Sequence, residues 1–217
     1  MRLGVLASGS GSNLQAILDA CASGRIPASQ VALVISNLAG AKALERAHRS
    51  GVPALLLPHK EHPSRDAYDA AIVASLEKHG VELVCLAGFM RLIGPVLLGA
   101  YRERILNIHP ALLPAFPGLH AVKQALAAGA RVSGCTVHVV DQGTDTGPIV
   151  IQAAVPVLDS DTEETLAARI LRQEHRCYPR AIQLFAEQRI SIEGRRVRVK
   201  SAWPDETKTV ASPPIED

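Results

Sequence analysis

Apolar runs alternate with segments of helical periodicity over the first 110 residues of the chain. The runs are short and almost continuous, as buried strands are, and lie at residues 3–7, 31–35, 53–57, 82–87 and 105–108. Helices are predicted between them, near residues 14–21, 42–50, 68–79 and 95–101. Because the runs are continuous rather than alternating, helices should cover both faces of the sheet. This half of the chain therefore predicts a doubly wound α/β arrangement with a parallel sheet.

The pattern changes after residue 110, where a Pro-rich loop and a short helix over 121–128 come next. Two strand-like runs follow, at residues 131–140 and 148–155. Residues 141–147 join them and are too few for a parallel crossover, so the two strands should pair antiparallel. We therefore expect a Rossmann-like α/β fold, with a doubly wound, mostly parallel sheet and an antiparallel C-terminal part.

The rest of the chain predicts one long helix and a small hairpin. The helix should run from Thr162 to Glu187, with an interruption or kink at Pro179, and the hairpin should turn at Glu193–Gly194. No internal repeat or long linker divides the chain. We expect a single domain over residues 1–190, made of the halves 1–110 and 111–190, and then a hairpin and a loosely attached tail over residues 191–217.

Composition and charge exclude several classes of protein. The 217 residues are 47% hydrophobic and carry a formal net charge of +2, unlike the strong basic bias of dedicated nucleic-acid binders. No apolar stretch approaches the roughly 18 residues of a membrane span, and the apolar N-terminal run is too short for a signal peptide. The four cysteines form no CxxC pair, which favours reduced thiols. We expect a cytoplasmic protein that binds neither nucleic acid nor membrane.

The segment 8–13, Ser-Gly-Ser-Gly-Ser-Asn, lies between the first strand and the first helix. Glycines and free N–H groups at a helix N-terminus favour an anion; the alternative is an ordinary tight turn. A nicotinamide dinucleotide is disfavoured, because Leu14 stands where its fingerprint has a third glycine and the second strand ends at Ser36–Asn37 without an acid. No Gly-Lys-Ser/Thr follows, as a P-loop requires. A small phosphomonoester fits this loop best.

Candidate catalytic groups lie at the end of the run 105–108. Asn107 and His109 should point to the same side of the sheet, at the edge where open α/β sheets collect their ligands. Asn can hydrogen-bond a substrate carbonyl, and His can exchange a proton near neutral pH. Asp145 belongs to a Gly/Asp/Thr-rich connection that taken alone is an ordinary turn. Beside His109, its carboxylate would stabilise the charged imidazole.

Other segments are less specific. Residues 88–93, Gly-Phe-Met-Arg-Leu-Ile, are either a plain strand-to-helix connection or one wall of an apolar ligand pocket. His59 and His62 have a metal-like spacing, but no further ligand is evident beside them, so we expect a surface loop and no metal. Glu174 and its neighbours on the long helix are by default solvated or only partly packed.

Together these motifs resemble the folate-dependent formyltransferases, and among them the phosphoribosylglycinamide formyltransferase family of purine synthesis. The resemblance runs in order over roughly residues 1 to 190 and rests on five stretches: Ser8–Gln15, Leu86–Arg91, Asn107–Pro114, Pro117–His120 and Gln173–His175. The Asn-x-His and Leu-Leu-Pro pattern is specific to folate formyltransferases in general. Asn13, Leu14 and Gln15 after the glycines narrow the resemblance to the glycinamide ribonucleotide branch.

The resemblance implies a role for individual residues. It makes Asn107, His109 and Asp145 the catalytic trio. The phosphate and ribose of the ribonucleotide would be bound by Gly11, Ser12, Asn13 and Glu174. The folate would be bound by Arg65, Met90, Arg91, Leu92, Ile93, Asn107, Asp141, Gln142, Gly143, Thr144 and Asp145. Residues 1–110 would then be the phosphate-binding half, and residues 111–190 the folate and catalytic-loop half.

The implied reaction moves the formyl group of 10-formyltetrahydrofolate, a co-substrate, to the amine of phosphoribosylglycinamide. It would require neither metal nor NAD, and its partners would be small molecules bound by a monomer or homodimer. Two positions depart from the family pattern. Ala111 stands where many relatives have Ser, and Thr146 follows the catalytic Asp where some relatives have Gly.

Three alternatives remain at this point. A formyltetrahydrofolate deformylase uses water as acceptor and should carry an N-terminal regulatory domain, whereas this chain begins on its first strand. A methionyl-tRNA formyltransferase should carry a C-terminal tRNA-binding domain, for which only a short tail is available. A non-catalytic phosphoribosyl or folate sensor should have lost the trio, yet Asn107, His109 and Asp145 are all present.

Overall fold

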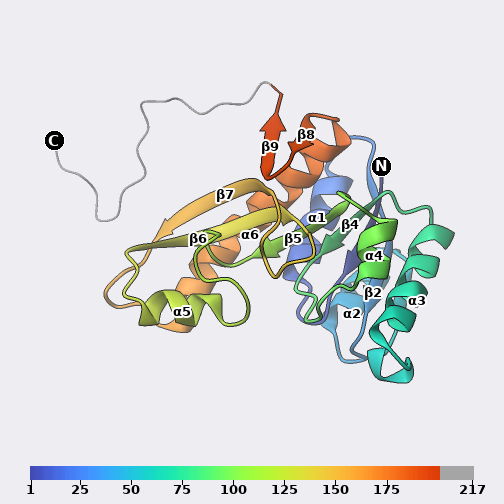
Figure 1. The fold of residues 1–217 in the computed structure, drawn as a ribbon, viewed down its shortest axis with the longest axis horizontal. Helices are drawn as coiled ribbons and strands as arrows, with labels where there is room; N and C mark the ends of the chain where they lie inside the picture. Colours follow the sequence, from blue (N-terminus) through green and yellow to red (C-terminus); the bar gives the residue numbers. More distant parts are fainter. Residues whose placement is uncertain (201–217) are drawn as a thin grey trace.

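The computed structural model describes residues 1–200 and joins seven strands into one mixed sheet. The strands lie in the order β3-β2-β1-β4-β5-β6-β7 (Figure 1). Their bounds are β1 Arg2–Leu6, β2 Gln30–Ser36, β3 Ala54–Leu56, β4 Leu83–Leu86, β5 Ile105–His109, β6 Val132–Val139 and β7 Ile149–Pro156. All pairs among β1 to β5 are parallel, whereas β6 is antiparallel to both β5 and β7. The predicted mostly parallel sheet with an antiparallel C-terminal part is confirmed.

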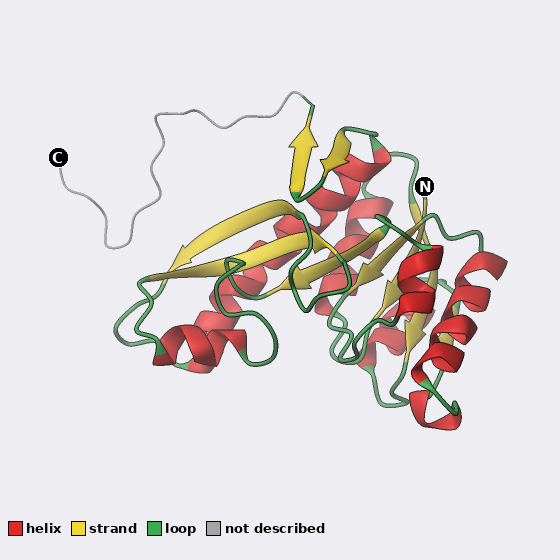
Figure 2. Ribbon diagram, in the orientation of Figure 1, coloured by secondary structure: helices red, strands yellow, loops and turns green. Residues whose placement is uncertain are grey.

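Helices cover both faces of this sheet (Figure 2). They are α1 Ser12–Ala22, α2 Lys42–Arg49, α3 Arg65–Lys78, α4 Pro95–Ala100, α5 Ala121–Ala127 and α6 Glu163–Ala186. One apolar core packs under α1 and α6, and a second packs under α3 and α4. Cys85 of β4 belongs to the first core, and its neighbours Val84 and Leu86 belong to the second. A strand buried on both faces must be apolar at every position, which explains the continuous runs in the sequence.

The two antiparallel strands extend the first core and leave polar residues on the other face. Cys135, Val137 and Val139 of β6 pack in the core under α6. Thr136 and His138 alternate with them and therefore point to the opposite face. In the β5–β6 ladder, His109 is paired with Thr136 and Asn107 with His138. The polar ends of β5 and β6 thus share one face.

Helix α6 is a single helix of 24 residues that passes through Pro179, so of the interruption or kink predicted there, the interruption is wrong. Pro179 is itself buried. The preceding residue, Tyr178, is fully buried, and its hydroxyl donates to the carbonyl oxygens of Leu86 and Leu106 at 3.0 and 2.9 Å. These contacts fix α6 against β4 and β5 on the N-terminal side of the proline. Tertiary packing therefore outweighs the hydrogen bond that the proline cannot donate.

The predicted hairpin is also present. Strands β8 (Ile190–Glu193) and β9 (Arg196–Val199) pair antiparallel, and Gly194 in the turn has a φ of 60°. Of the hairpin and loosely attached tail expected over residues 191–217, residues 201–217 lie outside the described part of the chain. Within residues 1–200, no helix is long and apolar enough to cross a bilayer.

Candidate active site

Strands β1 and β4 are neighbours at the point where the strand order reverses, which is where open α/β sheets bind ligands. Ser8 connects the loops that follow these strands. Its backbone N–H donates to the Gly88 carbonyl at 3.0 Å, and its Oγ accepts from the Met90 N–H at 2.9 Å. The same Oγ donates to Asn37 Oδ1, at 2.6 Å, at the end of β2. Ser8 therefore holds the glycine loop and the segment 88–93 together.

The glycine loop leaves the N-terminus of α1 open. Gly11 is the N-cap in the left-handed region with a φ of 69°, no side chain caps the helix, and the first turn has no acidic residue. The first backbone N–H groups of α1 are therefore available to an anion. A Cβ at Gly11 would lie 2.7 Å from the Cα of Ala43 in α2, so glycine is required at this position.

A buried pair of polar side chains lies beside this helix end. Asn13 Nδ2 donates to Glu174 Oε2 at 2.7 Å, although the two residues are 161 positions apart. The side chains are only 8% and 7% exposed, and Asn13 Oδ1 has no hydrogen-bond partner among the described residues. Burial raises the pKa of Glu174, and the Asn13 bond partly offsets the effect. The default of a solvated or only partly packed Glu174 is therefore wrong.

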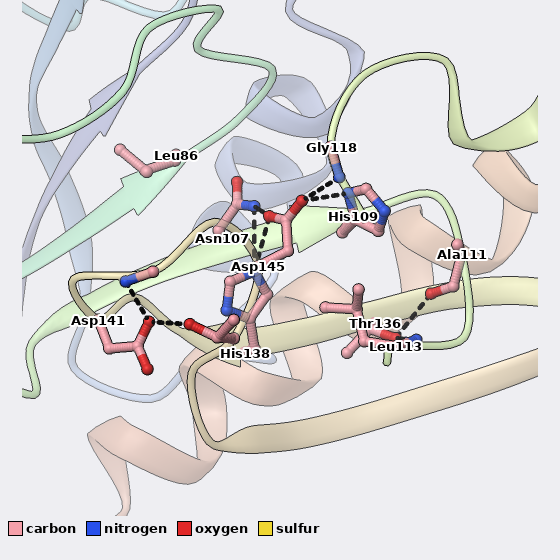
Figure 3. A network of polar contacts seen from close by, with 12 residues as sticks. Leu86, Asn107, His109, Ala111, Leu113, Gly118, Thr136, His138, Asp141 and Asp145 are labelled. Atoms are coloured by element: carbon pink, nitrogen blue, oxygen red, sulfur yellow. Dashed lines mark hydrogen bonds and ion pairs between the residues drawn. The ribbon is translucent and has the colours of Figure 1, made fainter. Parts of the chain in front are cut away.

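The structure brings Asn107, His109 and Asp145 together (Figure 3). Asp145 Oδ2 lies 3.3 Å from His109 Nδ1 and accepts from the Gly118 N–H at 2.8 Å, while Asp145 Oδ1 lies 3.4 Å from Asn107 Nδ2. The other ring nitrogen of His109, Nε2, lies 2.8 Å from the Phe116 carbonyl oxygen. Both nitrogens thus face acceptors, an arrangement that suits the doubly protonated imidazolium.

Asp145 is an ionised carboxylate in this arrangement. Burial on its own would raise its pKa, but the hydrogen bonds from His138 and Gly118 and the charge of His109 outweigh burial and lower it. Asp145 also has a φ of 54°, in the left-handed region that non-glycine residues seldom adopt. The strained backbone directs its carboxylate at the two histidines, which is typical of a functional site.

The loop 141–147, which carries Asp145, is held together by hydrogen bonds between its own residues. Thr146 Oγ1 donates to Asp141 Oδ1 at 2.6 Å, and the Gly143 N–H donates to the same oxygen at 3.1 Å. Residues 142–144 between them are exposed. The departure to Thr at position 146 is thus accommodated, because the hydroxyl is part of the loop.

The other predicted folate residues gather beyond β4. Met90 and Leu92 are 68% and 61% exposed, which is high for apolar side chains. Ile93 packs in the same apolar cluster as Val140, directly before the Asp141 loop. The guanidinium of Arg91 lies 5.8 Å from the centre of the Tyr68 ring. The segment 88–93 thus presents exposed apolar surface next to the Asp141 loop, as a pocket wall would.

His59 and His62 both pack against the same aromatic ring. Both lie edge-on against Tyr68, with ring centres 6.3 and 5.2 Å away. Over the described range 1–200, no group of three or more His, Cys, Asp or Glu side chains is arranged to hold a metal ion.

Comparison with known proteins identifies the family. Residues 1–182 match the family described as formyl transferase. This chain belongs to the formyl transferase family. The phosphoribosylglycinamide formyltransferase of Escherichia coli is 42% identical over 205 residues, or 94% of each chain, and that of Mycobacterium tuberculosis is 50% identical over 194 residues, or 89% of each.

Two further relatives complete the comparison. The trifunctional purine biosynthetic protein adenosine-3 of Drosophila pseudoobscura is 50% identical over 95% of this chain, which spans only 15% of that relative's length. The crystal structure of glycinamide ribonucleotide transformylase 1 from Symbiobacterium toebii is 61% identical, with a TM-score of 0.91 over 92% of this chain and 93% of that one.

One residue in the site of this formyl transferase was missed from the sequence. His138 is 2% exposed, and its Nε2 lies 3.1 Å from Asn107 Nδ2 and 3.5 Å from Asp145 Oδ1. It stands between the apolar Val137 and Val139, and a polar residue between two apolar ones was the available signal. Only the antiparallel register, which sets His138 opposite Asn107, connects it with the trio.

The substitution Gly11→Ala tests the formyl transferase's glycine loop. A non-glycine residue at a φ of 69° costs about 1–2 kcal/mol, and the new Cβ would also clash with Ala43. We expect the free energy of unfolding to fall by about 2 kcal/mol or more, and KM for a phosphorylated substrate bound at this helix end to rise at least about tenfold. Gly9→Ala is the matched control, because nothing lies within 4 Å of its added Cβ. Equal effects at both positions would contradict a special requirement at Gly11.

The substitution Glu174→Gln tests the buried pair. Glutamine still accepts from Asn13 but carries no charge, and hydrogen bonds to charged groups contribute about 1.5–3 kcal/mol against about 1 for neutral ones. We expect KM for a substrate that donates hydrogen bonds to this carboxylate to rise about tenfold with kcat nearly unchanged. Thermal unfolding should show no loss of stability, because burial already disfavours the charged carboxylate. Arg172→Gln, on an exposed position of the same helix, should leave both kinetic constants unchanged.

Proposed function

We infer that this formyl transferase moves the formyl group of 10-formyltetrahydrofolate to the amine of phosphoribosylglycinamide, as a step of purine biosynthesis. The products are the formylated ribonucleotide and tetrahydrofolate. The observation that carries the inference is the combination of two polar groupings at one edge of the sheet. One is the open N-terminus of α1 with the Asn13–Glu174 pair, and the other is the His109–Asp145 pair with Asn107.

We propose that the ribonucleotide binds at the start of α1. The backbone N–H groups of Gly11, Ser12 and Asn13, with the positive end of the helix dipole, bind the phosphate. The Glu174 carboxylate accepts hydrogen bonds from the ribose hydroxyls. Asn13 Oδ1, a buried acceptor without a donor among residues 1–200, is available to the same ligand.

We propose that the formyl folate binds between the segment 88–93 and the Asp141 loop. The exposed Met90 and Leu92 side chains supply an apolar surface that fits a flat ring system, and this supports the assignment. The proposed site is completed by Arg91, Ile93 and Asn107, by the backbone of residues 141–145, and by the exposed Arg65 at the start of α3. The bound folate supplies the formyl group, and the residues of this chain bind both substrates and stabilise the charge that develops during the transfer.

The catalytic roles follow from the hydrogen-bond donors at the end of β5. As the neutral amine attacks the formyl carbon, negative charge develops on the formyl oxygen, and Asn107 and protonated His109 donate hydrogen bonds to it. The bond between the formyl carbon and N10 of the folate then breaks, and the proton lost by the attacking amine is transferred to N10, which gives tetrahydrofolate. Asn107 Nδ2 lies 3.1 Å from His138 Nε2 and makes a longer contact of 3.4 Å to Asp145 Oδ1, so the N–H group that faces Asp145 must turn from the carboxylate to reach the substrate. His109 Nε2 faces the Phe116 carbonyl, which must release it when the substrate binds.

Asp145 keeps His109 charged and in position. Its carboxylate stabilises the imidazolium from the Nδ1 side, while Gly118 and His138 hold the carboxylate in place. The amine has to be neutral and the imidazole has to be charged, so the rate should fall at both low and high pH.

A formyl-transfer assay tests the proposal. Purified protein is incubated with 10-formyltetrahydrofolate, with and without phosphoribosylglycinamide, and tetrahydrofolate and formylated product are measured. We expect tetrahydrofolate to form only when the ribonucleotide is present. Release of formate without the ribonucleotide would instead indicate a deformylase, and binding of both ligands without product would indicate a sensor.

We further propose that residues 1–190 form one formyltransferase domain, in which 1–110 bind the phosphate and 111–190 supply the folate and catalytic loops. A cytoplasmic location is proposed because the cysteines are all free, as is usual in a reducing compartment.

The functional unit is a monomer or homodimer that acts on small molecules alone.

A further inference from the structure

A depression of about 330 Å³ lies beside the glycine loop, separate from the His109–Asp145 pair. Its polar lining residues are Ser12, Gln15, Asp19, Arg25, Arg46 and His175. Ser12, Gln15 and Asp19 recur at the spacing of one face of α1. The depression therefore extends from the open N-terminus of α1 along the side of this helix.

Arg46 of α2 lies at the glycine-loop end of the depression. Its Nε donates to the Ser10 carbonyl at 2.9 Å, and its Nη1 donates to Gln15 Oε1 at 3.1 Å. A guanidinium has five N–H donors, so these two bonds fix its plane and leave three donors for a ligand. Both partners are neutral oxygens, and within residues 1–200 no carboxylate neutralises the charge.

The remaining charged residues of the lining, Asp19 and Arg25, have opposite signs and lie near the C-terminal end of α1, away from the glycine loop. Asp19 accepts from Gln15 at 2.9 Å and lies seven residues beyond Ser12, which is about 10 Å along the helix axis. His175 of α6 has a buried Nε2 without a partner among the described residues. Its pKa is lowered by burial and, secondly, by the charge of Arg46, so the two side chains share one environment.

We propose that Arg46 is the cation that binds the phosphate of the ribonucleotide, with His175 closing the same pocket. The inference rests on the proposed function and extends it beyond the helix N-terminus. The helix dipole supplies only about half a positive charge, whereas a phosphomonoester near neutral pH carries between one and two negative charges. A planar guanidinium beside Ser10–Ser12 supplies the missing charge and can bind two phosphate oxygens at once.

The test compares phosphoribosylglycinamide with its dephosphorylated riboside as acceptors. Arg46→Gln removes the charge but keeps a side-chain donor for the Ser10 carbonyl. We expect it to lower kcat/KM for the phosphorylated acceptor about 10- to 100-fold, mainly through KM, and to leave kcat/KM for the riboside unchanged. Arg46→Lys should fall between Arg46→Gln and the wild-type protein, because it keeps the charge and loses the planar fork.

Arg49→Gln is the matched control, since Arg49 lies on the same helix, is 81% exposed and pairs only with Glu45. It should leave both acceptors unchanged. An equal loss for both acceptors in Arg46→Gln would show that Arg46 only shapes the loop and would overturn the inference. Unchanged kinetics in that variant would overturn it as well.

Failure of the proposed function would be recognised separately, because the wild-type protein would then transfer no formyl group to the ribonucleotide. In that case thermal unfolding with inorganic phosphate still tests Arg46. Phosphate should raise the Tm of the wild-type protein and of Arg49→Gln but not of Arg46→Gln. An equal rise in all three proteins would contradict the inference.

Discussion

Replacing His109 by alanine is expected to lower kcat for formyl transfer by about 10²- to 10⁴-fold. His109 is 5% exposed, its Nδ1 lies 3.3 Å from Asp145, and its Nε2, which lies 2.8 Å from the Phe116 carbonyl oxygen, can turn to the substrate. Alanine removes both the charged donor and the partner of Asp145. The KM values should change little, because the phosphate and the folate ring bind elsewhere.

The measurement is steady-state formyl transfer, with thermal unfolding to verify that the variant is folded. His48→Ala, on an exposed position of α2, is the control and should behave as the wild-type protein. A folded His109→Ala protein with near-native turnover would remove His109 from the mechanism and with it the proposed catalytic trio.

Replacing Asp145 by asparagine is expected to lower kcat by about 100-fold or more and to change its pH dependence. The amide matches the carboxylate in size but has no charge to stabilise the imidazolium. The loss of rate should therefore grow as the pH rises, because the variant has no carboxylate to pair with the charged imidazole. If kcat fell by the same factor at every pH, Asp145 would only position His109 and would not stabilise its charge.

The same variant has a second expected result, in stability. The pKa of Asp145 is lowered in the folded protein, because the His138 and Gly118 bonds and the His109 charge exceed the effect of burial. A carboxyl group with a lowered folded pKa stabilises the protein fully above its ordinary pKa of 3.8, and this contribution is lost as the pH falls through the folded value. Unfolding measured from neutral pH to below about pH 4 should thus show a smaller loss for Asp145→Asn than for the wild-type protein.

The strands were predictable because each one corresponds to a short apolar run of consecutive residues in the sequence. The run expected at 105–108 is β5 Ile105–His109, and that expected at 131–140 is β6 Val132–Val139. Strands covered on both faces have to be apolar throughout, and the short 141–147 connection permits only antiparallel pairing. The glycine loop was predictable for the same reason, since a left-handed N-cap at Gly11 needs a residue without Cβ.

Pro179 shows where local reasoning fails. Proline removes one donor from a helix, and the sequence predicts an interruption or a kink. The buried Tyr178 hydroxyl, held by two strand carbonyls, fixes the helix across that position. The strength of such packing depends on strands that lie far away in the sequence.

The sequence by itself determined the order of strands and helices, the open helix end at Gly11 and the polar residues at the end of β5. Only the tertiary structure decided which distant side chains meet them: Glu174 against Asn13, His138 beside Asn107 and Arg46 on the Ser10 carbonyl. The physical reason is that propensity and hydrophobic periodicity act over a few residues. Contacts between segments 31 to 161 residues apart depend instead on strand register and helix packing, which no local pattern specifies.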